Sequence, residues 1–338
     1  MNISHCPSCL KSGFHEFCLP CRKSLFGGKR VSPILAFSRP FYDRTKLEQA
    51  KRISISGVQS KHSLKLTGTT LELTDKGGEY ILKPIPAGAF ENPGALPANE
   101  HVTMQIARQI FGLSTAECAL VFFAEDFMPA FLTKRFDVLP GGLRTQQEDF
   151  AQIAQTSEES HGKNYKYDFS YEKIAALMKN HVSAYAVEVE KFFRLVLYNY
   201  LVHNGDAHIK NFSLYREPST NTHLLTPAYD LLNTGLHLPH ESSMALDLFE
   251  ANYETENFKT NGFYAYDDFF EFGTRIGIPP VRAERFIDET AGKTNRINAL
   301  LEKSSLQDSL KVQYAAMTKD RAKALSYSYS SPGAHRPR

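Results

Sequence analysis

The sequence lacks net charge, long apolar runs and internal repeats. Lys and Arg outnumber Asp and Glu by only two, so the overall charge favours no class of partner. No stretch approaches the roughly 18 consecutive apolar residues of a membrane span. The first residues are polar and include cysteine, without the apolar core of a signal peptide. We therefore expect a cytoplasmic protein with no membrane partner.

The length and composition allow a folded chain of more than one part. The 338 residues leave room for two modest domains, and 42% hydrophobic residues suffice for a sizeable core. Residues 1–65 contain 12 Lys and Arg against three acidic residues, a local charge of +9, so the remainder carries −7. A solvated surface explains this basic segment at least as well as a nucleic-acid contact, and we expect no direct nucleic-acid binding.

Four of the five cysteines form two close pairs near the N-terminus. Cys6 and Cys9 form one CxxC pair, and Cys18 and Cys21 form the second after a gap of eight residues. Two such pairs can close a tetrahedral Zn²⁺ site, which would supply folding energy to a segment with few large apolar residues. Disulfides suit a reducing compartment poorly, and a cluster without metal is the remaining alternative. Cys118 has the neighbours of an ordinary buried thiol.

The apolar pattern divides the rest of the chain into a β-rich part and an α-rich part. Alternating or apolar runs between turn signals predict strands over 63–66, 69–74, 79–84, 119–123 and 130–136. Asn99 is in position to cap a helix that stops at Gly112. From about residue 150 the pattern is helical, over 171–181, 186–204 and within 266–326. A β-rich small lobe followed by an α-rich large lobe is the predicted architecture.

Residues 203–215, HNGDAHIKNFSLY, place polar and ionisable side chains directly after an apolar helix. Asp206 and Asn211 have the spacing of a kinase catalytic loop, in which the Asp accepts a hydroxyl proton and the Asn binds metal. A predicted hairpin then leads to Asp230 in TPAYDLLN, a second hard oxygen donor of the kind that Mg²⁺ prefers. This order predicts phosphoryl transfer from ATP.

A kinase site also needs a lysine in the small lobe and an acidic partner for it. Lys83 ends the strand EYILKP, and Glu100 opens the helix that follows. Either residue alone is common on protein surfaces, but five parts in the right order indicate a nucleotide site. His208 lies two residues after Asp206. A contact with phosphate and a hydrogen bond that stabilises the loop are both open for it.

The motifs NGDAHIKNFSL and TPAYDLL resemble those of the HipA family of toxin serine/threonine kinases. SISGVQSK resembles the phosphate loop of that family, and QEDFAQIA and KYDFSYEKIAALM resemble its large-lobe segment before the catalytic helix. The similarity covers roughly residues 50–325, and the knuckle before CRKSLFGG is similar to that of short members from three-part toxin–antitoxin systems. It implies that Asp206 is the catalytic base, that Asn211 and Asp230 hold Mg²⁺, and that Lys83 holds the nucleotide.

The same resemblance implies further nucleotide contacts. The strand that ends at Lys134 and Phe136 looks like the hinge beside the adenine. The phosphate loop would use Ser56, Gly57, Val58, Gln59 and Lys61. Autophosphorylation of Ser54 and Ser56 is also implied. It would inhibit the kinase, because a phosphoserine adds about −1.5 to −2 charge where an anion must bind.

Together these patterns predict an α+β, bilobal protein-kinase-like fold with an N-terminal cysteine knuckle. The predicted parts are the knuckle at 1–30, the small lobe at 31–140, the large lobe at 141–326 and a disordered tail at 327–338. The family acts on aminoacyl-tRNA synthetases, so the resemblance implies a protein substrate of that class, with small antitoxin or DNA-binding proteins as partners. A small-molecule phosphotransferase of the aminoglycoside type and a regulatory pseudokinase are the alternatives.

Overall fold

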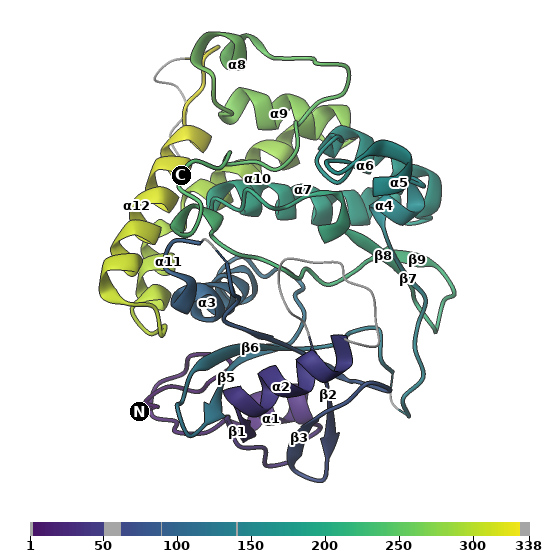
Figure 1. Ribbon diagram of the computed structural model, residues 1–338. Coiled ribbons are helices and arrows are strands. Elements are labelled where there is room, and N and C mark those ends of the chain that lie inside the picture. Colours follow the sequence, from purple (N-terminus) through teal and green to yellow (C-terminus); the bar gives the residue numbers. More distant parts are fainter. Residues whose placement is uncertain (1–2, 51–61, 89, 140, 332–338) are drawn as a thin grey trace.

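A β-sheet lobe and a helical lobe lie one above the other in the computed structural model of the chain (Figure 1). The structure describes residues 3–50, 62–88, 90–139 and 141–331. Within these ranges no helix combines the length and the apolar character that a membrane crossing requires. The two lobes confirm the predicted α+β, bilobal architecture.

The small lobe is built on a six-stranded sheet with the order β1-β5-β6-β4-β2-β3. Neighbouring strands are antiparallel, except that β1 and β5 run parallel. The strands are β1 (Ile34–Ser38), β2 (His62–Thr67), β3 (Thr70–Leu73), β4 (Tyr80–Pro84), β5 (Cys118–Ala124) and β6 (Pro129–Lys134). Five of them match predicted strands. The first was not predicted, because it is a short segment in a connector that contains Gly, Pro and Arg.

Each face of this sheet is covered by helices. Apolar side chains of the sheet pack with α1 (Leu19–Phe26) and α2 (Arg39–Ala50) on one face. The helix α3 (Leu96–Gln109) packs on β5 and β6 and lies between the sheet and the helical lobe (Figure 1). Both lobes therefore contact α3.

The predicted helix cap at Asn99 is wrong. The helix α3 begins at Leu96, preceded by a short 3₁₀ turn η1 (Pro93–Ala95), with Pro97 in its first turn. Asn99 is fully buried, and its side-chain amide donates to the Asn233 carbonyl at 2.8 Å and accepts from the Asn233 backbone amide at 3.2 Å. The Asn99 side chain thus forms its hydrogen bonds with the large lobe and does not cap the helix.

The large lobe contains a small sheet and a set of packed helices. The sheet has the order β7-β8-β9, with β7 (Gln147–Asp149), β8 (Ser213–Arg216) and β9 (His223–Leu225). The helix α6 (Tyr171–His181) has the predicted bounds, and the long apolar helix α7 (Tyr185–Leu201) runs through the core. The others are α4 (Phe150–Ile153), α5 (Glu158–His161), α8 (Glu256–Asn261), α9 (Tyr266–Arg275), α10 (Pro280–Ala291), α11 (Thr294–Leu301) and α12 (Asp308–Leu325). Short 3₁₀ turns η2 (Ile209–Asn211) and η3 (Thr234–Leu236) follow α7 and β9.

Part of the predicted C-terminal tail is attached to the large lobe. Ser328 donates from its hydroxyl to Asp267 at 3.0 Å, and the backbone amide of Tyr329 donates to the same carboxylate at 2.5 Å. Residues 327–331 are therefore held by hydrogen bonds, and residues 332–338 lie outside the described part of the chain.

Candidate active site and cysteine cluster

Three predicted site residues meet between the lobes. The Lys83 ammonium on β4 lies 2.5 Å from a Glu100 oxygen on α3 and also donates to the Asp230 carboxylate. Lys83 and Glu100 are almost fully buried, with 3% and 5% exposure. Burial opposes the charged ammonium, but the Asp230 and Glu100 carboxylates outweigh it and hold the pKa of Lys83 above its ordinary value. The group of one ammonium and two carboxylates carries a net charge of −1, which a cation beside Asp230 would balance.

Asp230 is held by an unusual backbone conformation and by its neighbours. Its φ is 55°, in the left-handed region that non-glycine residues rarely adopt. The segment before it pairs with residues 114–116, just before β5, because Ala116 N donates to Ala228 O at 2.9 Å and Ala228 N donates to Ser114 O at 2.8 Å. The Tyr229 hydroxyl donates to the Lys210 carbonyl at 3.0 Å. These bonds attach Asp230 to both the small lobe and the loop that carries Asp206.

The loop after α7 places Asp206 at the surface of the site. Gly205 N donates to the Thr234 hydroxyl at 2.8 Å, and a side chain at Gly205 would meet the Ser242 carbonyl at 2.2 Å. This close approach explains the glycine of the NGD motif. One Asp206 oxygen accepts a hydrogen bond of 2.6 Å from the Tyr167 hydroxyl, and the Asp206 side chain is still 47% exposed. The carboxylate can therefore be reached from solvent.

His208 lies beside this carboxylate with its ring buried. Its Nε2 is 3.8 Å from Asp206, and its Nδ1 has no hydrogen-bond partner among the described residues. Burial lowers the pKa of His208 below its ordinary value, against the opposing effect of the Asp206 and Asp230 carboxylates. The negative charges of Asp206 and Asp230 therefore both act on the His208 imidazole. The His208 backbone carbonyl accepts from the Asn211 backbone amide at 2.9 Å, which keeps Asn211 in the same turn.

The two predicted hinge residues differ in their placement. The β4–β6 register pairs Tyr80 with Lys134 and Lys83 with Phe131, so the side chains of Lys134 and Lys83 point to opposite faces of the sheet. The Lys134 ammonium donates to the Ser24 carbonyl at 2.8 Å. The structure therefore does not bring the Lys134 side chain to Lys83.

Phe136 lies closer to the predicted site. Its ring centroid is 5.8 Å from that of Tyr229, the residue before Asp230. The predicted phosphate-loop residues cannot be compared in this way. Ser54, Ser56, Gly57, Val58, Gln59 and Lys61 lie outside the described residues.

The four N-terminal cysteines form one cluster. One sulfur atom from each of Cys6, Cys9, Cys18 and Cys21 lies within 4.8 Å of all the others, and the sulfurs of Cys9 and Cys18 are 3.7 Å apart. Ligands of a tetrahedral zinc ion, with Zn–S of about 2.3 Å, would stand about 3.8 Å apart. Three of the four are buried. The donor atoms thus fit a structural Zn²⁺ site, as predicted from the two CxxC pairs.

The cysteine knuckle is attached to the kinase-like lobes by the carbonyl groups of three consecutive residues. The Pro7 carbonyl accepts from Leu120 N on β5 at 2.9 Å, the Ser8 carbonyl from His101 Nε2 on α3 at 2.7 Å, and the Cys9 carbonyl from Gln109 Nε2 at 2.9 Å. His101 is 1% exposed and directly follows Glu100. Burial lowers its pKa to about 4, so the ring is neutral at pH 7.

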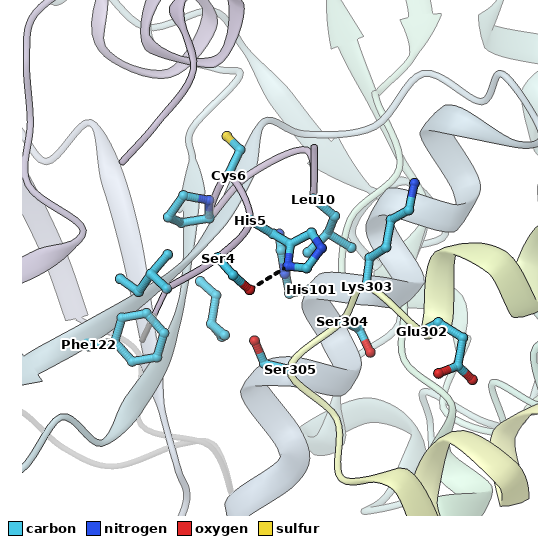
Figure 2. A pocket seen from close by; sticks show the side chains of 13 residues that line it. Ser4, His5, Cys6, Leu10, His101, Phe122, Glu302, Lys303, Ser304 and Ser305 are labelled. Carbon is cyan, nitrogen blue, oxygen red and sulfur yellow. Dashed lines mark hydrogen bonds between the residues drawn. The ribbon is translucent and has the colours of Figure 1, made fainter. Parts of the chain in front are cut away.

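A cavity of about 300 Å³ lies beside this attachment. Figure 2 shows Ser4, His5 and Cys6 of the knuckle on one side and Ser304 and Ser305, from the loop between α11 and α12, on the other. His101 also lines it (Figure 2). The knuckle therefore lies against both lobes, although the sequence predicted it as a separate part.

Sequence reasoning missed Tyr167. Its hydroxyl lies at the Asp206 carboxylate, yet it is 39 residues earlier in the chain. The only signal in the sequence was the stretch KYDFSYEKIAALM, which resembles a HipA segment as a whole but does not single out Tyr167.

The two lobes, the buried lysine between them and the acidic loop define a bilobal kinase-like protein. The sequence matches the family described as HipA-like C-terminal domain over residues 53–297, and the chain belongs to this family. It is 30% identical over 295 residues to a putative kinase of Haemophilus influenzae, which covers 83% of this chain and 84% of that protein. The predicted resemblance to HipA-like kinases is confirmed.

A relative with a more specific name is the serine/threonine-protein kinase toxin HipA of Shewanella oneidensis. It is 27% identical over 248 residues, covering 68% of this chain, while this chain spans about half of the toxin, 52%. A solved structure of Shewanella oneidensis HipA with HipB and operator DNA has a TM-score of 0.60 at 21% identity, covering 83% of this chain and 70% of that chain. The proinflammatory kinase CtkA of Helicobacter pylori has a TM-score of 0.50 at 14% identity, covering 81% and 91%. Both structures share the fold.

Proposed function

We propose that the chain is an ATP-dependent protein serine/threonine kinase and acts as a toxin. The observation that carries the proposal is the bridge formed by Lys83, which binds Glu100 of α3 and also Asp230, 147 residues after the lysine in the sequence. A lysine held by a helix-borne acid beside a second acid is the arrangement that protein kinases use for phosphoryl transfer. The family match and the similarity to the Shewanella kinase toxin support phosphoryl transfer as the reaction.

Each residue has a proposed part in the transfer. Lys83, oriented by Glu100, binds phosphate oxygens of ATP, and Asn211 and Asp230 hold Mg²⁺. When bound, Mg²⁺ neutralises charge on the phosphates. Asp206 accepts the proton of a substrate hydroxyl, whose oxygen forms a bond to the γ-phosphorus while the bond from that phosphorus to the β–γ bridging oxygen breaks and ADP leaves.

The remaining nucleotide contacts are proposed from the family resemblance and, for His208, Phe136 and Lys134, from the placement of their side chains. The unpartnered His208 Nδ1 supports a phosphate contact for that ring. Phe136 is proposed beside the adenine. For Lys134 only the backbone is proposed there, since its side chain points to the other face of the sheet. Residues 56–61 are proposed as the phosphate loop, and phosphorylation of Ser54 and Ser56 as the inhibitory modification.

A protein substrate is favoured over a cationic small molecule. The acids Asp267 and Asp268, which could have received such a substrate, are used by the chain itself. Asp268 accepts from Asn257 at 2.6 Å and from the Ala265 backbone at 2.7 Å, and Asp267 holds residues 328–330. We propose an aminoacyl-tRNA synthetase as the substrate class. We also propose small antitoxin or DNA-binding proteins as partners, as HipB and operator DNA are for the Shewanella protein.

The test is phosphate transfer by matched variants. Asp206→Asn and Asp230→Asn should each abolish incorporation of label from γ-labelled Mg-ATP, measured by autoradiography and intact-mass spectrometry. Asp320→Asn is the control, because Asp320 is 71% exposed on α12 and pairs only with the exposed Lys323 among the described residues. Transfer at the wild-type rate by either site variant would refute the proposed roles.

A further inference from the structure

Tyr167 stands where the proposed catalytic base needs support. The Asp206 side chain is 47% exposed, so packing alone does not fix the direction of its two oxygens. The Tyr167 hydroxyl donates to Oδ1 at 2.6 Å, a length typical of a strong hydrogen bond to a charged oxygen. With Oδ1 occupied in this way, Oδ2 is the oxygen left to accept a substrate proton.

Tyr167 is itself held by the loop that carries Asp206. Its ring and the His208 ring pack edge-to-face with their centroids 5.4 Å apart, and the Lys166 ammonium lies 4.7 Å from the centroid of the Tyr167 ring. The Lys166 carbonyl accepts from Ile209 N at 3.3 Å, and Tyr167 N donates to the Asn164 carbonyl at 2.8 Å. The turn before α6 and the catalytic loop therefore form one connected unit, in which the hydroxyl has a fixed position.

A purely structural role is better served by a nearby tyrosine. Tyr171 is fully buried, and its hydroxyl donates to the Ala207 carbonyl at 2.9 Å, which anchors the loop backbone. Tyr167 is 37% exposed, and its hydroxyl goes to a carboxylate instead of a backbone group. Burial and the neighbouring Asp206 raise the pKa of Tyr167 well above its ordinary value, so the hydroxyl remains a donor.

We propose that Tyr167 is a positioning residue that orients the Asp206 carboxylate toward the hydroxyl of the phosphate acceptor. The inference rests on the proposed function, because it assigns Tyr167 a role only through Asp206. Tyr167 transfers no proton itself. The acceptor proton moves to Oδ2 while the Tyr167 proton stays on its phenol oxygen.

The experiment compares Tyr167→Phe with Tyr165→Phe in the full chain. Tyr165 is a matched control, because its hydroxyl accepts from Lys210 at 3.3 Å and it does not contact Asp206 in any described interaction. ADP release from Mg-ATP and label incorporation are measured over a range of ATP concentrations. Tyr167→Phe should lower kcat by at least about tenfold, as expected for loss of a hydrogen bond to a charged group, with KM for ATP unchanged. Tyr165→Phe should behave as wild type.

Three outcomes separate the possible failures. If Asp206→Asn still transfers phosphate, the proposed function is wrong, and the role of Tyr167 that depends on it is wrong as well. If Asp206→Asn is inactive but Tyr167→Phe matches Tyr165→Phe, only the role of Tyr167 is wrong. If Tyr167→Phe lowers kcat, raises KM for ATP and lowers Tm together, Tyr167 supports the fold generally and the positioning role is overturned.

Discussion

Replacing Lys83 with methionine tests whether the buried ion pair stabilises the two-lobed fold. Met is apolar and of similar length, so it keeps the packing over the Phe131 ring while removing the charge. Glu100, at 5% exposure, then loses the ammonium 2.5 Å away, whereas the Asp230 side chain remains 30% exposed to water. Removing one member of a buried ion pair costs about 3–5 kcal/mol, and we expect Lys83→Met to lower the free energy of unfolding by this amount.

A second substitution identifies the cause of the loss. In Lys83→Met/Glu100→Gln a neutral amide replaces the carboxylate that faced the ammonium, and the lost hydrogen bond to the lysine costs about 1–3 kcal/mol. The double variant should therefore be more stable than Lys83→Met although both are inactive. Urea unfolding is measured for wild type, Lys83→Met, Glu100→Gln and the double variant. The control Lys323→Met, from an exposed ion pair, is expected within about 0.5 kcal/mol of wild type. A double variant as unstable as the sum of both single variants would refute this reasoning.

The other predictions concern the knuckle and the phosphate loop. Zinc should co-purify at about one ion per chain; Cys6→Ser/Cys9→Ser should lose it and speed hydrogen exchange in residues 3–26 and around His101, while a Cys118→Ser control keeps it. Metal-free protein with slow exchange in these segments would contradict this. Ser54→Ala/Ser56→Ala should remain growth-inhibitory on expression when wild type is silenced, since the variant cannot acquire the phosphates that compete with ATP. Phosphopeptide mapping that finds neither serine modified in wild type would contradict it.

The predictable part of the site consists of residues whose order in the chain is itself informative. Lys83 at the end of a strand, Glu100 in the next helix, and Asp206, Asn211 and Asp230 after an apolar helix follow the order found in protein kinases. Helix and strand positions were also predictable, because apolar periodicity reports which face is buried. The helix α6 has the predicted bounds for this reason.

The sequence did not specify contacts between residues that are distant along the chain. Asn99 has the composition of a helix cap, but its partner Asn233 is 134 residues further on. Lys134 ends a strand as a hinge residue would, but only the pairing register decides which face of the sheet its side chain occupies. Tyr167 meets Asp206 by a turn whose path no local pattern specifies.

The placement of the knuckle has a consequence for the site. Its cysteines were predicted as a metal centre from CxxC spacing, which reports only on local geometry. In the structure a hydrogen bond from His101 connects this centre to the residue next to Glu100. The Ser8 carbonyl, between Cys6 and Cys9, accepts from His101, and His101 neighbours the acid that holds Lys83. The conformation of the CxxC turn determines the position of the Ser8 carbonyl. Metal binding that orders this turn would therefore also fix the hydrogen bond between Ser8 and His101 of α3. Loss of the metal should therefore disturb nucleotide binding as well as the N-terminal segment, although no cysteine touches the proposed active site in the described residues.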